Sequence, residues 1–336
     1  IAAICAIAAN RERIVRIINS KGKMDEGAYS VSFCVNGVWE EVIVDDLFPC
    51  VTNSKQFAFT QSSVNEIWLS VLGKCWAKIH GGYFNVSAGL TREVLRAMTG
   101  ASCVTFFTRL EGDNLFDIMM FAYGKKYVIT AGSDDFNMGQ DTFIQKIGIA
   151  GCHAYSVLGV YIIAFDKKEG RPIRYEDLDN LPGDTVVERL VKLRNPWGKG
   201  EWTGDWSDSS NKWTSELRQA LDVQELDDGI FHMSWEDFKQ YFSDVQVCYY
   251  KEGYSYTSAK IQSEDNETQF FQIEFETTGE YFISVNQKNK RFFPMSAGYN
   301  YSPLSIFLAM EIDGKLIYGG CSVKADMENW VRIDPR

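Results

Sequence analysis

The sequence has few histidines, few prolines and no long apolar run. Only three of its 336 residues are histidine and seven are proline, so a mechanism that needs an imidazole depends on His80, His153 or His232. The longest uninterrupted apolar run spans residues 1–9, whereas a helix that crosses a bilayer needs about 18 such residues. The sequence therefore predicts no transmembrane segment.

The eight cysteines follow no metal-binding or redox motif. No Cys-x-x-Cys pair occurs, and no cysteine and histidine stand at the spacing of zinc ligands. The patterns of EF-hand loops, phosphate-binding loops, serine hydrolases and zinc proteases are absent as well. Several cysteines lie in apolar stretches, where a reduced cysteine packs as a small hydrophobic residue. Because reduced thiols are typical of the cytosol, we expect a cytoplasmic protein.

Negative charge is in excess along the chain. It carries 45 acidic and 34 basic side chains, which gives a formal net charge of −11. An acidic surface repels phosphate backbones, so we expect no nucleic-acid partner, whereas acidic clusters suit hard cations such as Ca²⁺. Its 45% apolar and 24% charged residues are typical of a soluble globular protein, and the length predicts about two domains.

Hydrophobic periodicity divides the chain into three parts, with breaks at Thr99-Gly100-Ala101 and near Lys251. Residues 1–100 are mainly helical and 101–250 mainly extended, and in the last part, 251–336, the pattern is extended from 269 onward. The expected helices span 1–18, 66–79, 91–98, 142–146, 215–221 and 235–242. The expected strands span 29–35, 38–44, 126–130, 154–165, 186–193, 245–250, 270–275, 281–285, 306–312 and 315–318, and Asn36-Gly37 predicts the turn of the first hairpin.

Each histidine has a structural and a functional interpretation. His80 lies in the last turn of an expected helix, where the helix dipole favours a cation. His232 stands between aromatic residues, which favours a packing or surface role. His153 opens an apolar strand after Gly151, and a base at the end of a buried strand can face a cleft. Spacing alone leaves both interpretations of His153 equally open.

An unusual segment, Leu193-Arg-Asn-Pro-Trp-Gly-Lys-Gly-Glu-Trp-Thr-Gly-Asp-Trp-Ser-Asp208, combines an amide with aromatic and acidic residues. Asn195 follows an apolar strand, and its amide could accept from a histidine Nδ1–H while Trp197 shields that bond from water. A tight, aromatic-rich turn is the alternative. Two loops also carry the carboxylates of Glu201, Asp205, Asp208, Asp227 and Asp228. They suit a Ca²⁺ site, or they form a solvated acidic surface.

This segment and Gly151-Cys-His-Ala-Tyr-Ser-Val157 together resemble the calpain family of cysteine proteases. The resemblance covers about 1–250 in consistent order, and 251–336 are similar, more weakly, to the β-sandwich that follows the calpain protease core. It implies an α+β fold, with a papain-like two-lobed core (lobe 1, 1–100; lobe 2, 101–250) followed by part of an antiparallel, C2-like β-sandwich over 251–336.

The resemblance also implies a Cys-His-Asn mechanism. His153 matches the base, Asn195 the residue that orients it, and Trp197 the neighbouring tryptophan. The matching cysteine would stand about three residues before Ile1, so we expect the chain by itself to be inactive. Cys5, inside an apolar helix where burial raises a thiol pKa, and Cys152, an expected packing residue, are poor substitutes.

Calcium ligands follow from the same resemblance. Glu66 matches a ligand of one site, whose other ligands would lie upstream. Glu201, Asp208 and Asp228 match ligands of a second site, where Ile230 replaces an acid that the family often has. Loss of one oxygen ligand weakens the expected affinity for Ca²⁺.

Three functions are therefore open. The first is a calcium-dependent intracellular cysteine endopeptidase that acts on protein substrates. The second is a non-catalytic calpain homologue that serves as a calcium-binding scaffold, which has no need to keep His153 and Asn195. The third is a calcium or phospholipid adaptor that acts through its β-sandwich.

Overall fold

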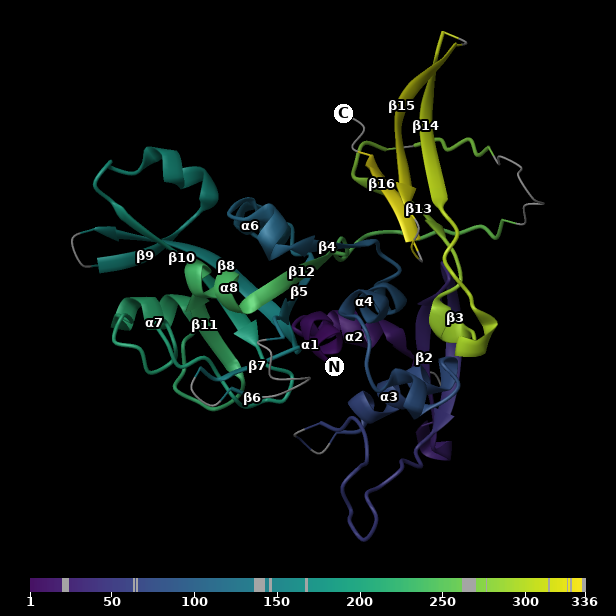
Figure 1. Cartoon of the computed structure of the whole chain (residues 1–336), viewed down its shortest axis with the longest axis horizontal. Helices are drawn as coiled ribbons and strands as arrows, with labels where there is room; N and C mark the ends of the chain where they lie inside the picture. Colours follow the sequence, from purple (N-terminus) through teal and green to yellow (C-terminus); the bar gives the residue numbers. More distant parts are fainter. Residues whose placement is uncertain are drawn as a thin grey trace.

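The computed structural model describes residues 1–19, 24–62, 64, 66–135, 143–144, 147–166, 169–261, 270–275, 277–313, 315–324, 326 and 328–333. It mixes helices with antiparallel sheets, which confirms the expected α+β class (Figure 1). The limits of the three expected domains stay a prediction. In the described part of the chain, no helix is long and apolar enough to cross a membrane.

The helices are distributed along most of the chain. The α-helices are α1 (Ala2–Ala8), α2 (Arg11–Ile17), α3 (Trp68–Ile79), α4 (Thr91–Thr99), α5 (Thr108–Glu111), α6 (Asn114–Gly124), α7 (Ser215–Leu221) and α8 (Trp235–Tyr241). Short 3₁₀ helices span Met24–Glu26, Tyr83–Val86, Tyr175–Asn180, Lys290–Phe292 and Met295–Ala297.

The strands form one large sheet and several small ones. They are β1 (Ile18–Asn19), β2 (Ala28–Val35), β3 (Val38–Asp45), β4 (Cys103–Phe107), β5 (Val128–Ser133), β6 (Phe143–Ile144), β7 (Ile149–Ala150), β8 (Ala154–Asp166), β9 (Glu169–Ile173), β10 (Val186–Arg194), β11 (Ile230–Ser234), β12 (Phe242–Cys248), β13 (Tyr281–Asn286), β14 (Leu304–Ile312), β15 (Lys315–Lys324) and β16 (Glu328–Ile333). The large sheet has the order β11-β10-β8-β5-β12-β4, and β9 pairs with β8.

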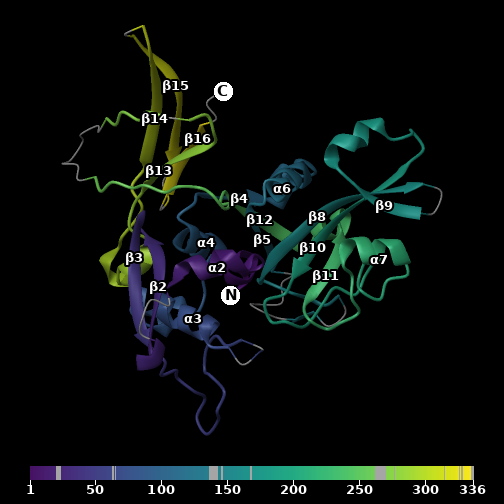
Figure 2. The same ribbon diagram turned by 180° about the vertical axis from the view of Figure 1, so that it is seen from behind.

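The first 17 residues form two helices, so the expected single helix over 1–18 is wrong. Asn10 has an extended backbone, and its side chain accepts the backbone N–H of Glu12 at 3.1 Å. An asparagine that caps a new helix in this way ends the preceding one. α1 then lies between the large sheet and the β2–β3 hairpin in both views (Figure 2).

The β2–β3 hairpin confirms the prediction from Asn36-Gly37. Both turn residues have positive φ values, 51° and 80°, as a two-residue turn of matching twist requires. α3 and α4 also form where expected, and they pack with this hairpin and α1 around one hydrophobic core. Cys103, Val128 and Cys248, from the large sheet, belong to the same core.

The large sheet has its own core, to which α6 contributes Leu115, Phe116 and Met119, all fully buried. The sequence did not predict α6, because its segment is apolar nearly all round and shows no distinct helical face. α7 and α8 form at the expected positions. The helix expected over 142–146 is wrong at the two described residues, which form β6, and its remaining residues lie outside the described ones.

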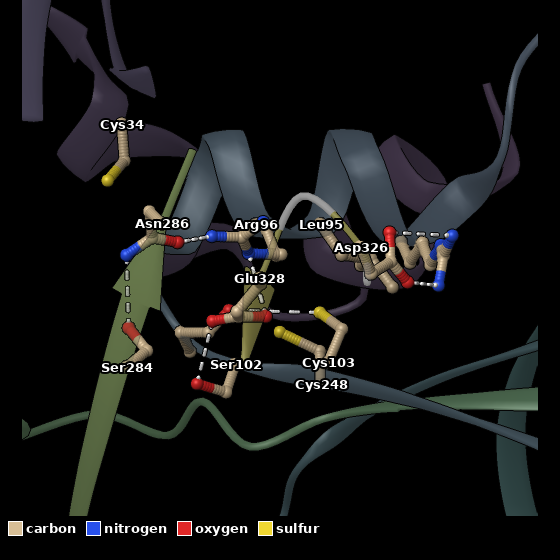
Figure 3. Close-up of polar contacts among 12 residues, drawn as sticks. Cys34, Leu95, Arg96, Ser102, Cys103, Cys248, Ser284, Asn286, Asp326 and Glu328 are labelled. Atoms are coloured by element: carbon tan, nitrogen blue, oxygen red, sulfur yellow. Dashed lines mark hydrogen bonds and ion pairs between the residues drawn. The ribbon is translucent and has the colours of Figure 1, made fainter. Parts of the chain in front are cut away.

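In the C-terminal part, β13 pairs with β16 and β14 with β15, whereas the expected strand over 270–275 has no regular structure. Charged contacts hold this part against α4 (Figure 3). The buried Glu328 carboxylate lies 3.0 Å from Arg96 Nε and accepts the Ser102 hydroxyl at 3.0 Å. Arg92 pairs with Asp326 at 2.8 Å. The C-terminal strands thus dock beside the segment that joins α4 to β4.

Candidate active site

His153 and Asn195 lie at the same edge of the large sheet. His153 immediately precedes β8, and Asn195 immediately follows the antiparallel strand β10, whose Arg194 pairs with Ser156. Because β8 begins where β10 ends, two side chains 42 residues apart come together, and His153 Nε2 lies 3.1 Å from Asn195 Oδ1. The expectation of an Nδ1 contact is wrong, since the nitrogen that faces the amide is Nε2.

The hydrogen bonds of Asn195 fix which way its amide points. Its Oδ1 also accepts the backbone N–H of Trp197 at 3.1 Å, and its Nδ2 donates to the Gly200 carbonyl at 3.1 Å. Oδ1 therefore faces the imidazole, and Nε2 has to be the donor. A neutral His153 then carries its proton on Nε2 and its lone pair on Nδ1, so Nδ1 is the nitrogen that can act as a base.

Aromatic rings enclose the His153–Asn195 contact. The Trp197 ring centroid lies 4.4 Å from that of His153, and Trp197 remains 41% exposed. The Tyr155 ring centroid lies 5.1 Å from that of His153, with the two rings perpendicular. Asn195 is completely buried, so its hydrogen bonds form away from bulk water. Tyr155 was missed as a neighbour, although residues i and i+2 of a strand share one face.

The start of α1 reaches the same edge. The Ser156 hydroxyl donates to the Ala2 carbonyl at 2.9 Å, and Ser156 is three residues from His153. Burial raises the pKa of the Cys5 thiol, although the positive charges of Arg194 and the amino terminus oppose this. Cys5 therefore lacks the low pKa of an activated thiol. Cys152, expected to be a packing residue, is exposed instead.

The other two histidines are buried and held neutral. Burial, together with the cation of Arg291, lowers the pKa of His80 to about 4, and burial, together with Lys192, lowers that of His232 to about 3. Neither ring has a hydrogen-bond partner among the described residues. The expectation that the helix dipole favours a cation at His80 is therefore wrong, and His232 is a packing rather than a surface residue.

The acidic residues Glu201, Asp208 and Asp228 gather beside Asn195. Glu201 Oε1 accepts the backbone N–H groups of Asp228 at 2.9 Å and Gly229 at 2.8 Å, which joins the two loops. Burial, followed by the charges of Glu201 and Asp228, raises the pKa of Asp208 to about 7. Arg218 and Lys192 offset part of this repulsion.

These oxygen donors and their crowded negative charge are of the chemical type that binds a hard cation such as Ca²⁺. Their arrangement does not match a metal site, because within the described ranges no group of three His, Cys, Asp or Glu side chains is placed to hold a metal ion. Ile230 donates its backbone N–H to the Asp228 carboxylate at 2.8 Å. Glu66 precedes α3, and its carboxylate accepts the Trp68 indole N–H at 2.9 Å.

The two remaining acids have other partners. Asp205 pairs with Lys212 at 2.9 Å, and Asp227 accepts the backbone N–H of Gly200 at 3.0 Å. The Gly200 carbonyl also accepts a hydrogen bond from the Asn195 side-chain amide, so this loop connects the acidic residues to the residue that contacts His153. A movement of either acidic loop would therefore be transmitted to Asn195 through its hydrogen bond with Gly200.

Comparison with known proteins gives one consistent family. The model of the calpain family cysteine proteases matches residues 1–249. The curated relatives include calpain-type cysteine protease DEK1 of Zea mays, 32% identical over 72% of this chain and 10% of the relative. Calpain-9 of Homo sapiens is 30% identical over 74% of this chain and 34% of the relative. The calpain-2 catalytic subunit of Bos taurus is 30% identical over 74% and 33%. The chain thus spans about a third or less of these relatives.

Proposed function

Because the chain belongs to the calpain family of cysteine proteases, we propose that it forms part of a calcium-dependent cysteine endopeptidase with His153 as its base. The observation that carries this proposal is the contact of 3.1 Å between His153 Nε2 and Asn195 Oδ1. That contact directs the basic Nδ1 away from the amide and fixes the tautomer. We expect protein substrates and a cytoplasmic location, as the sequence predicts.

In the proposed reaction, His153 Nδ1 takes the proton of a cysteine thiol. The thiolate attacks the peptide carbonyl, and the Nδ1–H then protonates the leaving amine, which leaves a thioester that water hydrolyses. Asn195 keeps the imidazole oriented and stabilises its charged form through Nε2–H. Trp197 and Tyr155 keep water from this hydrogen bond.

The proposal places the thiol ahead of Ile1, close to the start of α1. One contact supports this position: the Ala2 carbonyl accepts the Ser156 hydroxyl of β8 at 2.9 Å. Residues before α1 would then approach the edge where His153 lies. A helix start also lowers a thiol pKa.

We further propose that Glu201, Asp208 and Asp228 bind Ca²⁺. When bound, the cation would neutralise the repulsion that raises the pKa of Asp208. The loop that carries Glu201 begins at Asn195, so its order affects how firmly the amide holds His153. A non-catalytic scaffold has no use for the His153–Asn195 contact, and no described feature favours that alternative.

The test uses the full-length protein, a fluorogenic protein substrate and a cysteine-directed epoxide probe, with Ca²⁺ or with a chelator. We expect the native protein to cleave the substrate and to be labelled by the probe when Ca²⁺ is present. We expect the Asp208→Asn variant to show neither cleavage nor labelling at low Ca²⁺. Absence of labelling under both conditions contradicts the endopeptidase. Equal activity with the chelator contradicts the calcium dependence alone.

A further inference from the structure

The turn that leads into His153 has a strained backbone. Cys152 has a φ of 49°, in the left-handed region that favours glycine and disfavours a residue with a β-carbon. Such a conformation persists only where surrounding groups hold it. Because Cys152 is adjacent to His153, whatever holds this turn also sets the direction in which the imidazole leaves the backbone.

One side chain joins both ends of the turn. Ser133, the last residue of β5, is buried, and its hydroxyl donates to the Ala150 carbonyl at 2.6 Å while accepting the backbone N–H of His153 at 2.9 Å. The Ser133 backbone N–H donates to the His153 carbonyl at 2.9 Å. Ser133 therefore holds His153 on both sides of its Cα.

Other groups hold single points of the same turn. The Ala150 N–H donates to the Tyr155 hydroxyl at 2.8 Å, and the Cys152 N–H donates to the Asp134 carbonyl at 3.0 Å. Neither of these bonds reaches His153 itself. The Ser133 hydroxyl alone, among the bonds described for residues 150–153, links the start of the turn to the histidine.

We propose that Ser133 is a positioning residue for His153. Asn195 fixes the imidazole at Nε2, and the Ser133 hydroxyl fixes the backbone from which the imidazole extends. Two separate restraints are needed because a hydrogen bond at one ring nitrogen still permits the ring to pivot about it. With both, Nδ1 keeps the direction that proton transfer requires.

This proposal rests on the proposed protease function for its kinetic test, which again uses the full-length protein. Replacement of the hydroxyl by Ser133→Ala should lower kcat by about 10-fold to 100-fold, since misplacement of a catalytic group by about 1 Å has an effect of that size. KM should change by less than about twofold, because Ser133 is buried behind the histidine. A fall in cleavage due only to a higher KM contradicts a positioning role.

A matched pair of variants separates the hydroxyl from the shape of the side chain. Ser133→Thr keeps the hydroxyl, and Ser133→Val replaces it with a methyl group in a side chain of the same shape. We expect kcat to be higher in the threonine variant than in the valine variant by about 10-fold. Thr130→Val, which removes another buried hydroxyl of β5 bonded to Gln246, should leave kcat unchanged.

Nitrogen-15 NMR of the histidine rings tests the same idea without catalysis. In the native protein we expect the shifts of the Nε2–H tautomer at His153, and in Ser133→Ala a mixture of both tautomers. If the native protein does not cleave substrate, the proposed function fails and the NMR comparison still decides the role of Ser133. An unchanged tautomer, with unchanged kcat in an active protein, overturns the positioning role.

Discussion

Two histidines of the large sheet lie in opposite environments. His153 precedes β8 at the edge of the sheet, half-buried, with Asn195 Oδ1 at 3.1 Å from its Nε2. His232 lies within β11, 1% exposed, with the Trp213 ring centroid at 5.2 Å and no hydrogen-bond partner among the described residues. The same side chain is thus oriented in one region and enclosed in the other.

Under the proposed function, a strongly lowered pKa does not mark the histidine that acts as the base. His232 has a pKa lowered to about 3, mainly by burial, so a search among the histidines for the most strongly shifted pKa would select it rather than His80. Its environment instead excludes solvent and disfavours the protonated form of the ring. His153 has what a base needs, which is an oriented ring at the end of a strand.

The largest expected effect separates these two histidines directly. His153→Ala should reduce peptide cleavage by the full-length protein by about 10³-fold or more, because the base and the proton donor are both lost. The midpoint of thermal unfolding should change little, since the ring is half-buried. His232→Phe, which keeps an aromatic ring in the cluster, should retain cleavage. Comparable losses in both variants would remove the distinction.

Removal of the orienting amide should have the next largest effect. Asn195→Ala is expected to lower kcat by about 10-fold to 100-fold, because the imidazole loses its tautomer and direction. It should also destabilise the fold by about 1–3 kcal/mol, since the Trp197 N–H and the Gly200 carbonyl lose their partner. Urea unfolding and steady-state kinetics measure the two effects. Full activity would mean that the contact does not orient the base.

The enclosed histidine should reveal itself through acid stability. The folded pKa of His232 is about 3 and the ordinary value is 6.5, so below pH 6.5 the unfolded chain binds the proton and the folded one does not. Stability is therefore lost as the pH falls from about 6.5 toward 3. Between pH 7.5 and 5 this amounts to about 2 kcal/mol.

His232→Phe should remove that part of the pH dependence, as measured by urea unfolding at the two pH values. His80, with its pKa lowered to about 4, remains in both proteins and keeps its own contribution. An identical slope in the native protein and the variant would show that His232 is protonated in the folded state.

The smallest effect is expected in the acidic loops beside Asn195. The folded pKa of Asp208 is raised to about 7 from 3.8, so its favourable contribution is present below pH 3.8 and is lost as the pH rises through about 7. In a chelator, Asp208→Asn should therefore gain stability over the native protein between pH 5 and 8. Solvent screening keeps the gain below about 1 kcal/mol, which differential scanning fluorimetry can detect. A gain that is the same at both pH values would contradict the raised pKa.

Much of the secondary structure could be predicted from local patterns. The Asn36-Gly37 turn and α7 form where expected because a turn dipeptide and a regular apolar period are properties of a few neighbouring residues. α6 was missed because its residues are apolar on all sides. The division between α1 and α2 depends on one asparagine, whose capping role competes with an unbroken helical pattern.

The candidate site also has features that the sequence predicts and features that it does not. Its motifs, around His153 and Asn195, led to the family from sequence alone, since residue types and spacing are local facts. The sequence could not show that Nε2 rather than Nδ1 meets the amide, because that depends on how β8 and β10 pair. It gave no sign of Ser133, whose hydroxyl acts across two strands that are joined only in the fold.

The sequence by itself therefore determined the α+β class, the main helices and hairpin, and the residues that resemble a protease site. The tertiary structure alone decided which ring nitrogen of His153 faces the Asn195 amide, which histidines are buried away from solvent, and which carboxylates repel one another. The physical reason is distance: hydrogen bonds, burial and charge act over a few ångströms, and only folding brings residues such as Ser133, His153, Asn195 and Asp208 within that range.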